Sequence, residues 1–173
     1  MPVTWLAFAY QAPAEPSKAR VYIWRKLKEC GAAYFKQGVA VLPKSPASLA
    51  KFRSIAIKTR EMGGEATIAE LRFIDAHDEV EMVGRFQNRS QDEYRELINE
   101  ISRLRESIRQ RSAQDDRVDR AKRTAKQYRQ VRSRDYFKSA AAPDIAAALD
   151  ELIGDMTRAP DELARYFVQA LEK

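Results

Sequence analysis

The spacing of apolar residues changes at residue 75, and this change restricts the chain to an α+β fold. Before residue 75, short apolar runs of strand length alternate with segments in which apolar residues recur every three or four positions. After residue 75, only the second spacing remains. Short runs are typical of strands, and three-to-four spacing is typical of amphipathic helices. The sequence therefore predicts a sheet domain over 1–75 and an all-helical region over 76–173.

Within residues 1–75 the pattern predicts four strands and two helices. Glycine accepts a positive φ, so Gln37-Gly38 is expected to form the turn of a hairpin. Ser45-Pro46 favours the start of a helix, and Gly63-Gly64 favours its end. The strands are expected at 3–10, 32–36, 39–42 and 65–74, and the helices at 18–30 and 45–62.

The predicted order of these elements is β-α-β-β-α-β. This order is typical of the ferredoxin-like fold, in which two helices cover one side of a four-stranded antiparallel sheet. We therefore expect a ferredoxin-like sheet domain that is followed by a helical extension.

The helix over 18–30 is expected to bury one row of apolar residues. An aromatic residue in such a row packs in a core more often than it binds a ligand. Trp24 is therefore predicted to be buried, with basic residues around the edge of the helix. The row recurs at intervals of three, with Ile23 beside it: Val21, Trp24, Leu27 and Cys30.

Two apolar stripes predict a helical hairpin over about 90–134. Ser90 to Glu93 has the form of a capping box, in which Ser and Glu side chains satisfy free backbone N–H groups at a helix start. A turn is expected within 111–116, because the stripes differ in phase. The first stripe has heptad spacing, at Tyr94, Leu97, Ile98, Ile101, Leu104 and Ile108. The second is Val118, Ala121, Ala125, Tyr128 and Val131.

Two shorter helices are expected over about 143–172, from Pro143 to Met156 and from Pro160 to Leu171, since Pro fits the first turn of a helix. The heptad stripe could pack inside the chain or against a second copy. Small domains of this kind also pair through sheet edges, so we expect a homodimer.

The net charge of +6 is the sum of blocks of opposite sign. Residues 1–74 contain 12 basic and 5 acidic residues, 75–102 contain 3 and 8, 103–134 contain 12 and 4, and 135–173 contain 4 and 8. Such basic segments lie on solvated helix faces or bind phosphate groups. Both interpretations stay open for this chain.

The segment from Arg117 to Arg134 favours the two interpretations equally. Asp119 is its only acidic residue, whereas a solvated helix more often alternates both signs. Lys and Arg side chains that contact DNA phosphates release counterions. The candidate nucleic-acid-binding residues are Arg20, Arg25, Lys28, Arg117, Arg120, Lys122, Arg123, Lys126, Arg129 and Arg132.

Signatures of catalysis and of metal binding are weak. One Cys excludes an internal disulfide, and one His without a Cys partner excludes the common zinc clusters. Asp75, His77, Asp78 and Glu79 could hold a metal ion, but the helix dipole more often explains an acidic helix start. Cys30 is expected to be a buried thiol. We therefore expect no enzyme activity, no catalytic residue and no metal site.

Two stretches of the sequence contain motifs that can be compared with known families. The first, within 19–43, contains an Arg-x-x-x-Trp-Arg-x-Leu-Lys-x-x-Gly helix and a Gly-Val-x-x-Leu-Pro strand end. The second is 134–137. Together with Arg85-Phe86 and Tyr94, these stretches are similar to the N-terminal region of the ChrB family of chromate-resistance regulators. A weaker likeness of the first stretch is to the central domain of PaaX-type repressors. The residues that match the family motifs are Arg20, Trp24, Arg25, Leu27, Lys28, Gly31, Gly38, Pro43, Arg134, Asp135 and Phe137.

The resemblance implies a DNA-binding transcriptional regulator of chromate-efflux genes, with double-stranded DNA and a second copy as partners. It implies an oxyanion effector such as chromate and no other cofactor. Members of this family continue into a C-terminal domain, so we expect this chain to lack a full sensing domain, which a separate chain could supply. No apolar run is long enough to cross a membrane, and we expect a cytoplasmic protein. The alternatives are a non-catalytic adaptor protein and, less favoured, a metal-dependent nuclease.

Overall fold

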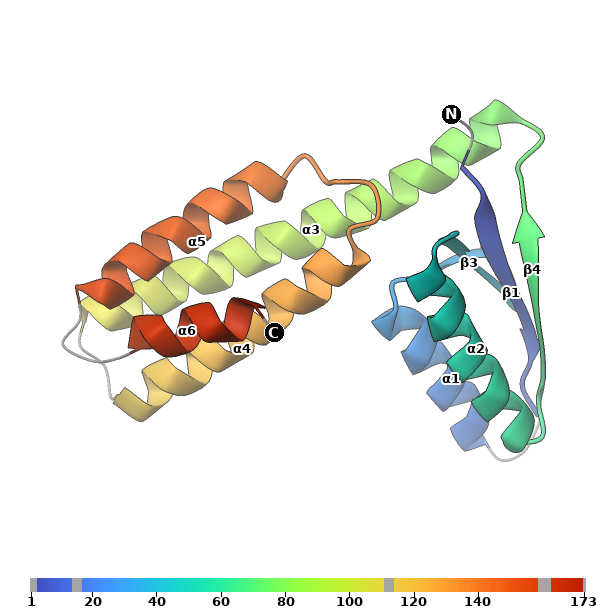
Figure 1. Ribbon diagram of the computed structural model, residues 1–173, viewed down its shortest axis with the longest axis horizontal. Helices are drawn as coiled ribbons and strands as arrows, with labels where there is room; N and C mark the ends of the chain where they lie inside the picture. The colour runs from blue at the N-terminus through green and yellow to red at the C-terminus, as the bar shows by residue number, and fades with distance from the viewer. Residues whose placement is uncertain (1–2, 14–16, 111–113, 159–162, 173) are drawn as a thin grey trace. The chain divides into compact units, whose positions relative to one another are not determined.

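The computed structural model describes residues 3–13, 17–110, 114–158 and 163–172. Within these residues it has an α+β fold with one four-stranded antiparallel sheet and six helices (Figure 1). The chain divides into two compact units, Met1–Phe86 (unit 1) and Gln87–Lys173 (unit 2). The sequence predicts a domain boundary at residue 75. Helix α3 (Ala76–Arg109) begins directly after this residue, and its first turns belong to unit 1.

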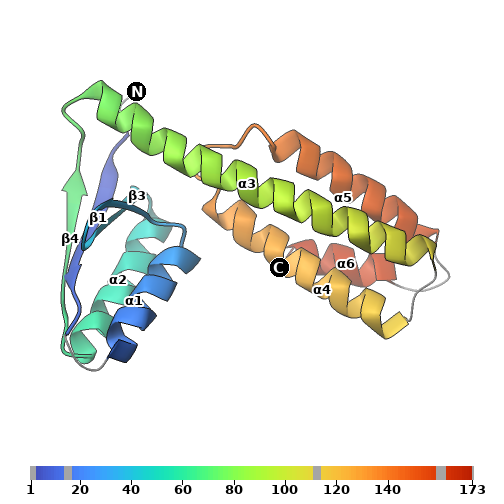
Figure 2. The same ribbon diagram turned by 180° about the vertical axis from the view of Figure 1, so that it is seen from behind.

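Unit 1 contains the sheet, and its elements follow the expected order. The sheet order is β2-β3-β1-β4, and each neighbouring pair of strands is antiparallel. Both helices that connect strands lie on the same side of the sheet (Figures 1 and 2). The elements are β1 (Trp5–Gln11), α1 (Ser17–Glu29), β2 (Ala33–Lys36), β3 (Val39–Pro43), α2 (Pro46–Glu61) and β4 (Glu65–Leu71).

Strand β1 is covered on both sides, as its continuous apolar run predicts. Phe8 faces the helices, and its ring centroid lies 5.3 Å from that of Phe52 in α2. Trp5 faces the opposite side, where the ring centroids of Phe73 and Phe86 lie 5.9 Å and 5.6 Å away. The first turns of α3 therefore contribute to the core of unit 1.

The turn between β2 and β3 requires glycine, as predicted. Gly38 has a φ of +75°, and a Cβ at this position would lie 3.1 Å from the carbonyl oxygen of Tyr10. The Gly38 carbonyl in turn accepts the backbone N–H of Tyr10 at 2.8 Å. The turn is thus held directly against β1.

Helix α1 buries a different side from the predicted one. Val21 is 53% exposed and Trp24 is 49% exposed, so the prediction that Trp24 lies in the core is wrong. A three-residue step falls about 60° short of a full helical turn, so a row built only from such steps leaves the buried side. Steps of four, four and three stay on that side. The buried row is Ala19, Ile23, Leu27 and Cys30.

Helix α3 begins at Ala76, and the predicted helix start at Ser90 is wrong. Asp75 caps the helix, because its Oδ1 accepts the backbone N–H of His77 at 2.8 Å. Ser90 lies inside α3 and is 2% exposed. The helix continues through Ser90 because the buried row extends upstream of Tyr94 in steps of four residues. This row is Met82, Phe86, Ser90, Tyr94, Leu97, Ile101, Leu104 and Ile108.

Replacing Asp75 with alanine is expected to lower the free energy of unfolding by about 1 kcal/mol, because the helix loses its side-chain cap. Urea unfolding followed by circular dichroism measures the change. Asp78→Ala is the matched control, since Asp78 is an exposed carboxylate in the first turn of the same helix. Equal losses in the two variants would contradict a capping role for Asp75.

Unit 2 is formed by the remainder of α3 with α4 (Gln114–Arg134), α5 (Ala142–Thr157) and α6 (Leu163–Glu172). Helices α3 and α4 lie side by side and antiparallel in both views, as the hairpin prediction requires (Figures 1 and 2). Helix α3 ends at Arg109 and α4 begins at Gln114, so the break overlaps the expected segment 111–116, of which residues 111–113 lie outside the described residues. Pro160, the predicted start of the last helix, also lies outside them.

Both predicted stripes face one core within unit 2, although Ile98, Val118 and Tyr128 are only partly buried. The heptad stripe of α3 packs with Ala121, Ala125 and Val131 of α4. The heptad stripe therefore packs inside the chain, which is one of the two alternatives that the sequence left open. Helices α5 and α6 complete the core with Ile145, Leu149, Leu152, Met156, Leu163 and Phe167.

An ion-pair network joins α3 to α5 beside this core. Arg105 Nε donates to Asp155 Oδ2 at 2.7 Å, and the Arg105 guanidinium also pairs with Glu151. Arg109 and Arg158 each reach the Asp155 carboxylate at 3.4 Å. The hydrogen bond from Arg105 holds the pKa of Asp155 below its ordinary value. Asp155 is therefore charged at neutral pH and orients α5 against α3.

Candidate nucleic-acid interface

The candidate nucleic-acid-binding residues fall into two groups. Arg20, Arg25 and Lys28 lie on α1 of unit 1, and the other seven lie on α4 of unit 2. Each group is therefore a surface of its own unit.

Helix α4 has a narrow apolar side and a broad basic side. The Ala, Arg, Lys and Gln residues that dominate its sequence are strong helix formers. Ala121, Ala125 and Val131 face the core of unit 2. Arg132 and Arg134 in the last turn suit the negative end of the helix dipole.

Three cations, here called the α4 strip, follow one line along the outer side of α4: Lys122, Lys126 and Arg129. Spacings of four and three residues place them about 6 Å and about 4.5 Å apart along the helix axis. Lys122 and Lys126 are exposed, and Arg129 is half-buried. Among the described residues, no acidic side chain forms an ion pair with the strip. The strip therefore presents positive charge that the described acidic side chains of unit 2 do not neutralise by direct pairing.

The α4 strip borders a groove of about 440 Å³ between α4 and α6. Glu172 is the single acidic residue among the described residues that line it. Guanidinium and ammonium groups around a concave surface suit the oxygens of a phosphate group. The lining residues are Lys126, Arg129, Gln130, Arg132, Ser133, Leu171 and Glu172.

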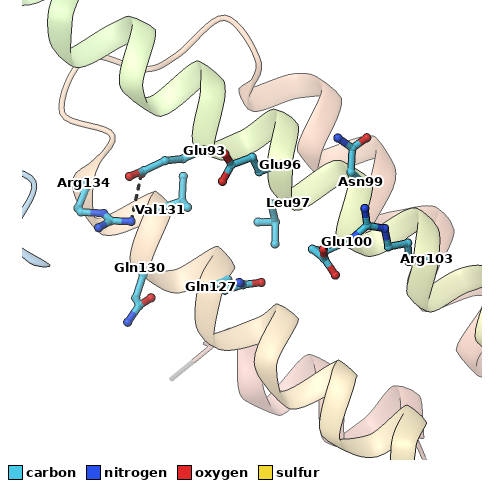
Figure 3. Close-up of a pocket in the computed structure, with 10 residues that line it drawn as sticks. All are labelled: Glu93, Glu96, Leu97, Asn99, Glu100, Arg103, Gln127, Gln130, Val131 and Arg134. Carbon is cyan, nitrogen blue, oxygen red and sulfur yellow. Dashed lines mark hydrogen bonds and ion pairs between the residues drawn. The ribbon is translucent and has the colours of Figure 1, made fainter.

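The side of α4 that faces α3 carries charges of both signs. A second groove, of about 390 Å³, lies there and is lined by Glu93, Glu96 and Glu100 of α3 (Figure 3). Gln127 and Gln130 of α4 line the facing wall. Arg134 and Arg103 also line the groove, and they pair with Glu93 at 3.1 Å and with Glu100 at 2.6 Å. Two of the three carboxylates are therefore neutralised by direct pairing within the groove.

The motif stretch at 134–137 is structural. Arg134 pairs with Glu93 at 3.1 Å, and this ion pair joins the end of α4 to α3 (Figure 3). Asp135 accepts the backbone N–H of Ser139 at 2.9 Å and the hydroxyl of Tyr94 at 3.3 Å. Phe137 is half-buried. These contacts hold the turn between α4 and α5.

The motif stretch at 19–43 combines structural and exposed residues. Leu27 is fully buried, Gly31 has a φ of 75°, and Pro43 is the last residue of β3. The exposed residues of this motif are Arg20, Trp24, Arg25 and Lys28.

Three of the residues considered for catalysis or metal binding, Asp75, Glu79 and Cys30, have structural roles. Asp75 caps α3, and Glu79 Oε1 accepts the Val3 backbone N–H at 3.0 Å and the Trp5 indole N–H at 3.3 Å. Cys30 is buried and donates to the Leu27 carbonyl at 3.2 Å. The described part of the chain contains no cluster of three His, Cys, Asp or Glu side chains that could hold a metal ion. None of its helices is long and apolar enough to span a membrane.

The row of carboxylates that α3 contributes to the groove beside α4 is a feature that sequence reasoning missed. Glu93, Glu96 and Glu100 are spaced by three and four, which places them on one side of a helix. This spacing could have identified an acidic stripe. It could not have shown that the stripe faces α4.

Comparison with known proteins gives one consistent result. The family model described as "Protein ChrB, N-terminal" matches residues 20–168. "Protein ChrB" of Cupriavidus metallidurans is 26% identical over 156 residues, which cover 86% of this chain and 47% of that protein. The chain thus spans about half the length of this curated relative. No solved structure matches the chain.

Proposed function

The chain belongs to the ChrB N-terminal family, and from this premise we propose that it is a DNA-binding transcriptional regulator of the chromate-resistance type. The observation that carries the proposal is the α4 strip, whose positive charge is unpaired among the described residues. In this proposal the strip binds backbone phosphates of duplex DNA. Arg120, Arg123 and Arg132 on α4 and Arg20, Arg25 and Lys28 on α1 add further phosphate contacts.

Phosphate contacts of this kind give affinity and orientation rather than base specificity. A regulator of this design would therefore need a second source of sequence recognition. In the proposal a second copy contributes to it, because a homodimer on a two-fold site requires two half-sites at a fixed spacing. Unit 1 is proposed to be a ferredoxin-like domain, which the element order and the sheet order β2-β3-β1-β4 support.

Chromate is proposed as the effector. It is a tetrahedral dianion, so the same cationic groups that suit DNA phosphates suit its oxygens. The proposal leaves the full sensing function to a further domain or a separate chain. It includes no catalytic step, since Asp75 and Glu79 are hydrogen-bonded within unit 1.

The test is a fluorescence anisotropy titration of the purified protein on the duplex upstream of its own gene, at salt concentrations from about 50 to 200 mM. Each bound phosphate adds about −0.9 to the slope of log K against log salt, so three strip contacts alone predict about −3. Chromate is expected to weaken duplex binding by this chain, and discrimination against sulfate is expected only where the further domain or separate chain supplies the sensing function. Absence of binding to any duplex at low salt would overturn the proposal and favour a non-catalytic adaptor.

A further inference from the structure

The outer side of α1 has a half-exposed tryptophan among cations, and duplex phosphate binding does not require it. Trp24 is 49% exposed, and Val21, one helical turn before it, is 53% exposed. Arg20 and Lys28 lie one turn on either side of Trp24, and Arg25 borders it. Burial of an aromatic side chain is favourable, and exposed Trp beside Arg is typical of contact surfaces.

The indole of Trp24 is partly ordered by its neighbour. Lys28 Nζ lies 5.1 Å from the centroid of the Trp24 ring, which is a cation–π contact. An aromatic ring that is held in this way loses little conformational freedom when it binds a flat partner.

The positive charge around Trp24 favours a polyanion as the binding partner. Helix α1 contains five basic residues and one acidic residue, and α2 beside it contains four and one. Both acidic residues are already paired within their helices, Glu29 with Lys26 at 2.6 Å and Glu61 with Lys58 at 3.0 Å. No described acidic residue pairs with Arg20 or Arg25. A lipid surface would require a larger apolar side than Val21 and Trp24 provide.

We propose that the outer side of α1 binds a single-stranded or locally unpaired segment of nucleic acid, with Trp24 stacked on one base. Arg20, Arg25 and Lys28 bind the adjacent phosphates in this arrangement. Every base offers a flat π face, and stacking on an aromatic side chain among cations is the common way in which single strands are bound. A duplex hides these faces inside its stack, so the indole selects unpaired bases. The inference rests on the proposed function for the nature of the partner.

The two tryptophans of the chain make the test direct, because Trp5 is fully buried and Trp24 is half-exposed. A thymidine oligonucleotide is expected to quench the Trp24 part of the intrinsic emission, and Trp24→Phe is expected to abolish the quenching. By anisotropy, Trp24→Ala is expected to lower single-strand affinity about tenfold. Tyr166→Ala, which removes an exposed aromatic side chain from α6, is the matched control and is expected to change nothing.

Three outcomes would overturn the inference. They are unchanged emission at saturating oligonucleotide, unchanged affinity of Trp24→Ala, and equal quenching by polyglutamate, which would assign the surface to acidic proteins. The test is separable from that of the proposed function. If duplex binding fails while the oligonucleotide still quenches Trp24, the proposed function is wrong and this inference stands; the reverse result overturns only the inference.

Discussion

Replacing Lys122, Lys126 and Arg129 together with glutamine is expected to lower the affinity for duplex DNA by about 10²–10³-fold at 0.1 M salt. Each lost phosphate contact removes the counterion release that favours binding. The slope of log K against log salt is expected to become shallower by about 2.7 for the three contacts. Anisotropy titrations at several salt concentrations measure both changes. Glutamine is uncharged, unbranched and close to the replaced residues in helix propensity, so α4 should remain folded.

The chain offers a control that is matched in charge. Arg95, Arg103 and Arg158 are exposed arginines of unit 2, and each pairs with a nearby acidic residue of its own helix region. Replacing these three with glutamine changes the net charge by the same amount. This variant is expected to keep most of the wild-type affinity. If both triple variants lose affinity equally, net charge rather than the α4 strip governs binding.

Ile101→Ala is expected to lower the free energy of unfolding by about 2–5 kcal/mol, because it leaves a cavity in the core of unit 2. Ile101 is 1% exposed and lies in the middle of the buried row of α3. Guanidinium unfolding at equilibrium measures the loss. Ile98→Ala is the matched control, since Ile98 is the same residue type on the same helix and is only partly buried. Both variants gain the same helix propensity, so a loss at Ile98 as large as at Ile101 would contradict the assigned core.

The class and order of elements were predictable because they depend on local patterns. Period-two runs and glycine turns identified the strands, and Gly38 has the positive φ that its position required. The heptad stripe from Tyr94 to Ile108 is a core row because its spacing is regular over several turns. Such patterns need no knowledge of distant residues.

The errors occurred where two local signals compete. At α1, the row through Trp24 and the row through Ile23 both look apolar, and only the sheet decides which one is buried. At Ser90, the residues of a capping box are present, but buried Met82 and Phe86 extend the helix upstream of this position. In both places packing against other elements outweighs the local signal.

The basic character of α4 was predictable from the sequence, but the surroundings of the helix were not. The sequence did not indicate that Glu93, Glu96 and Glu100 of α3 line a groove beside α4. Arg134 and Asp135 match the family motif, but their side chains form contacts within unit 2 that hold the turn after α4. Their match to the motif therefore has a structural explanation. Pairing between distant residues is not visible in a spacing pattern.

The difference in pairing between the two grooves beside α4 has a kinetic consequence. In the groove that faces α3, Glu93 and Glu100 are neutralised by Arg134 and Arg103. The cations of the α4 strip have no acidic partner among the described residues, so the electric field of this part of unit 2 is strongest on the side of the strip. In the proposed complex a polyanion would experience this asymmetry before any contact is made, and encounters would begin with the strip facing the partner. Removing the charges of the strip would therefore slow association most strongly at low salt.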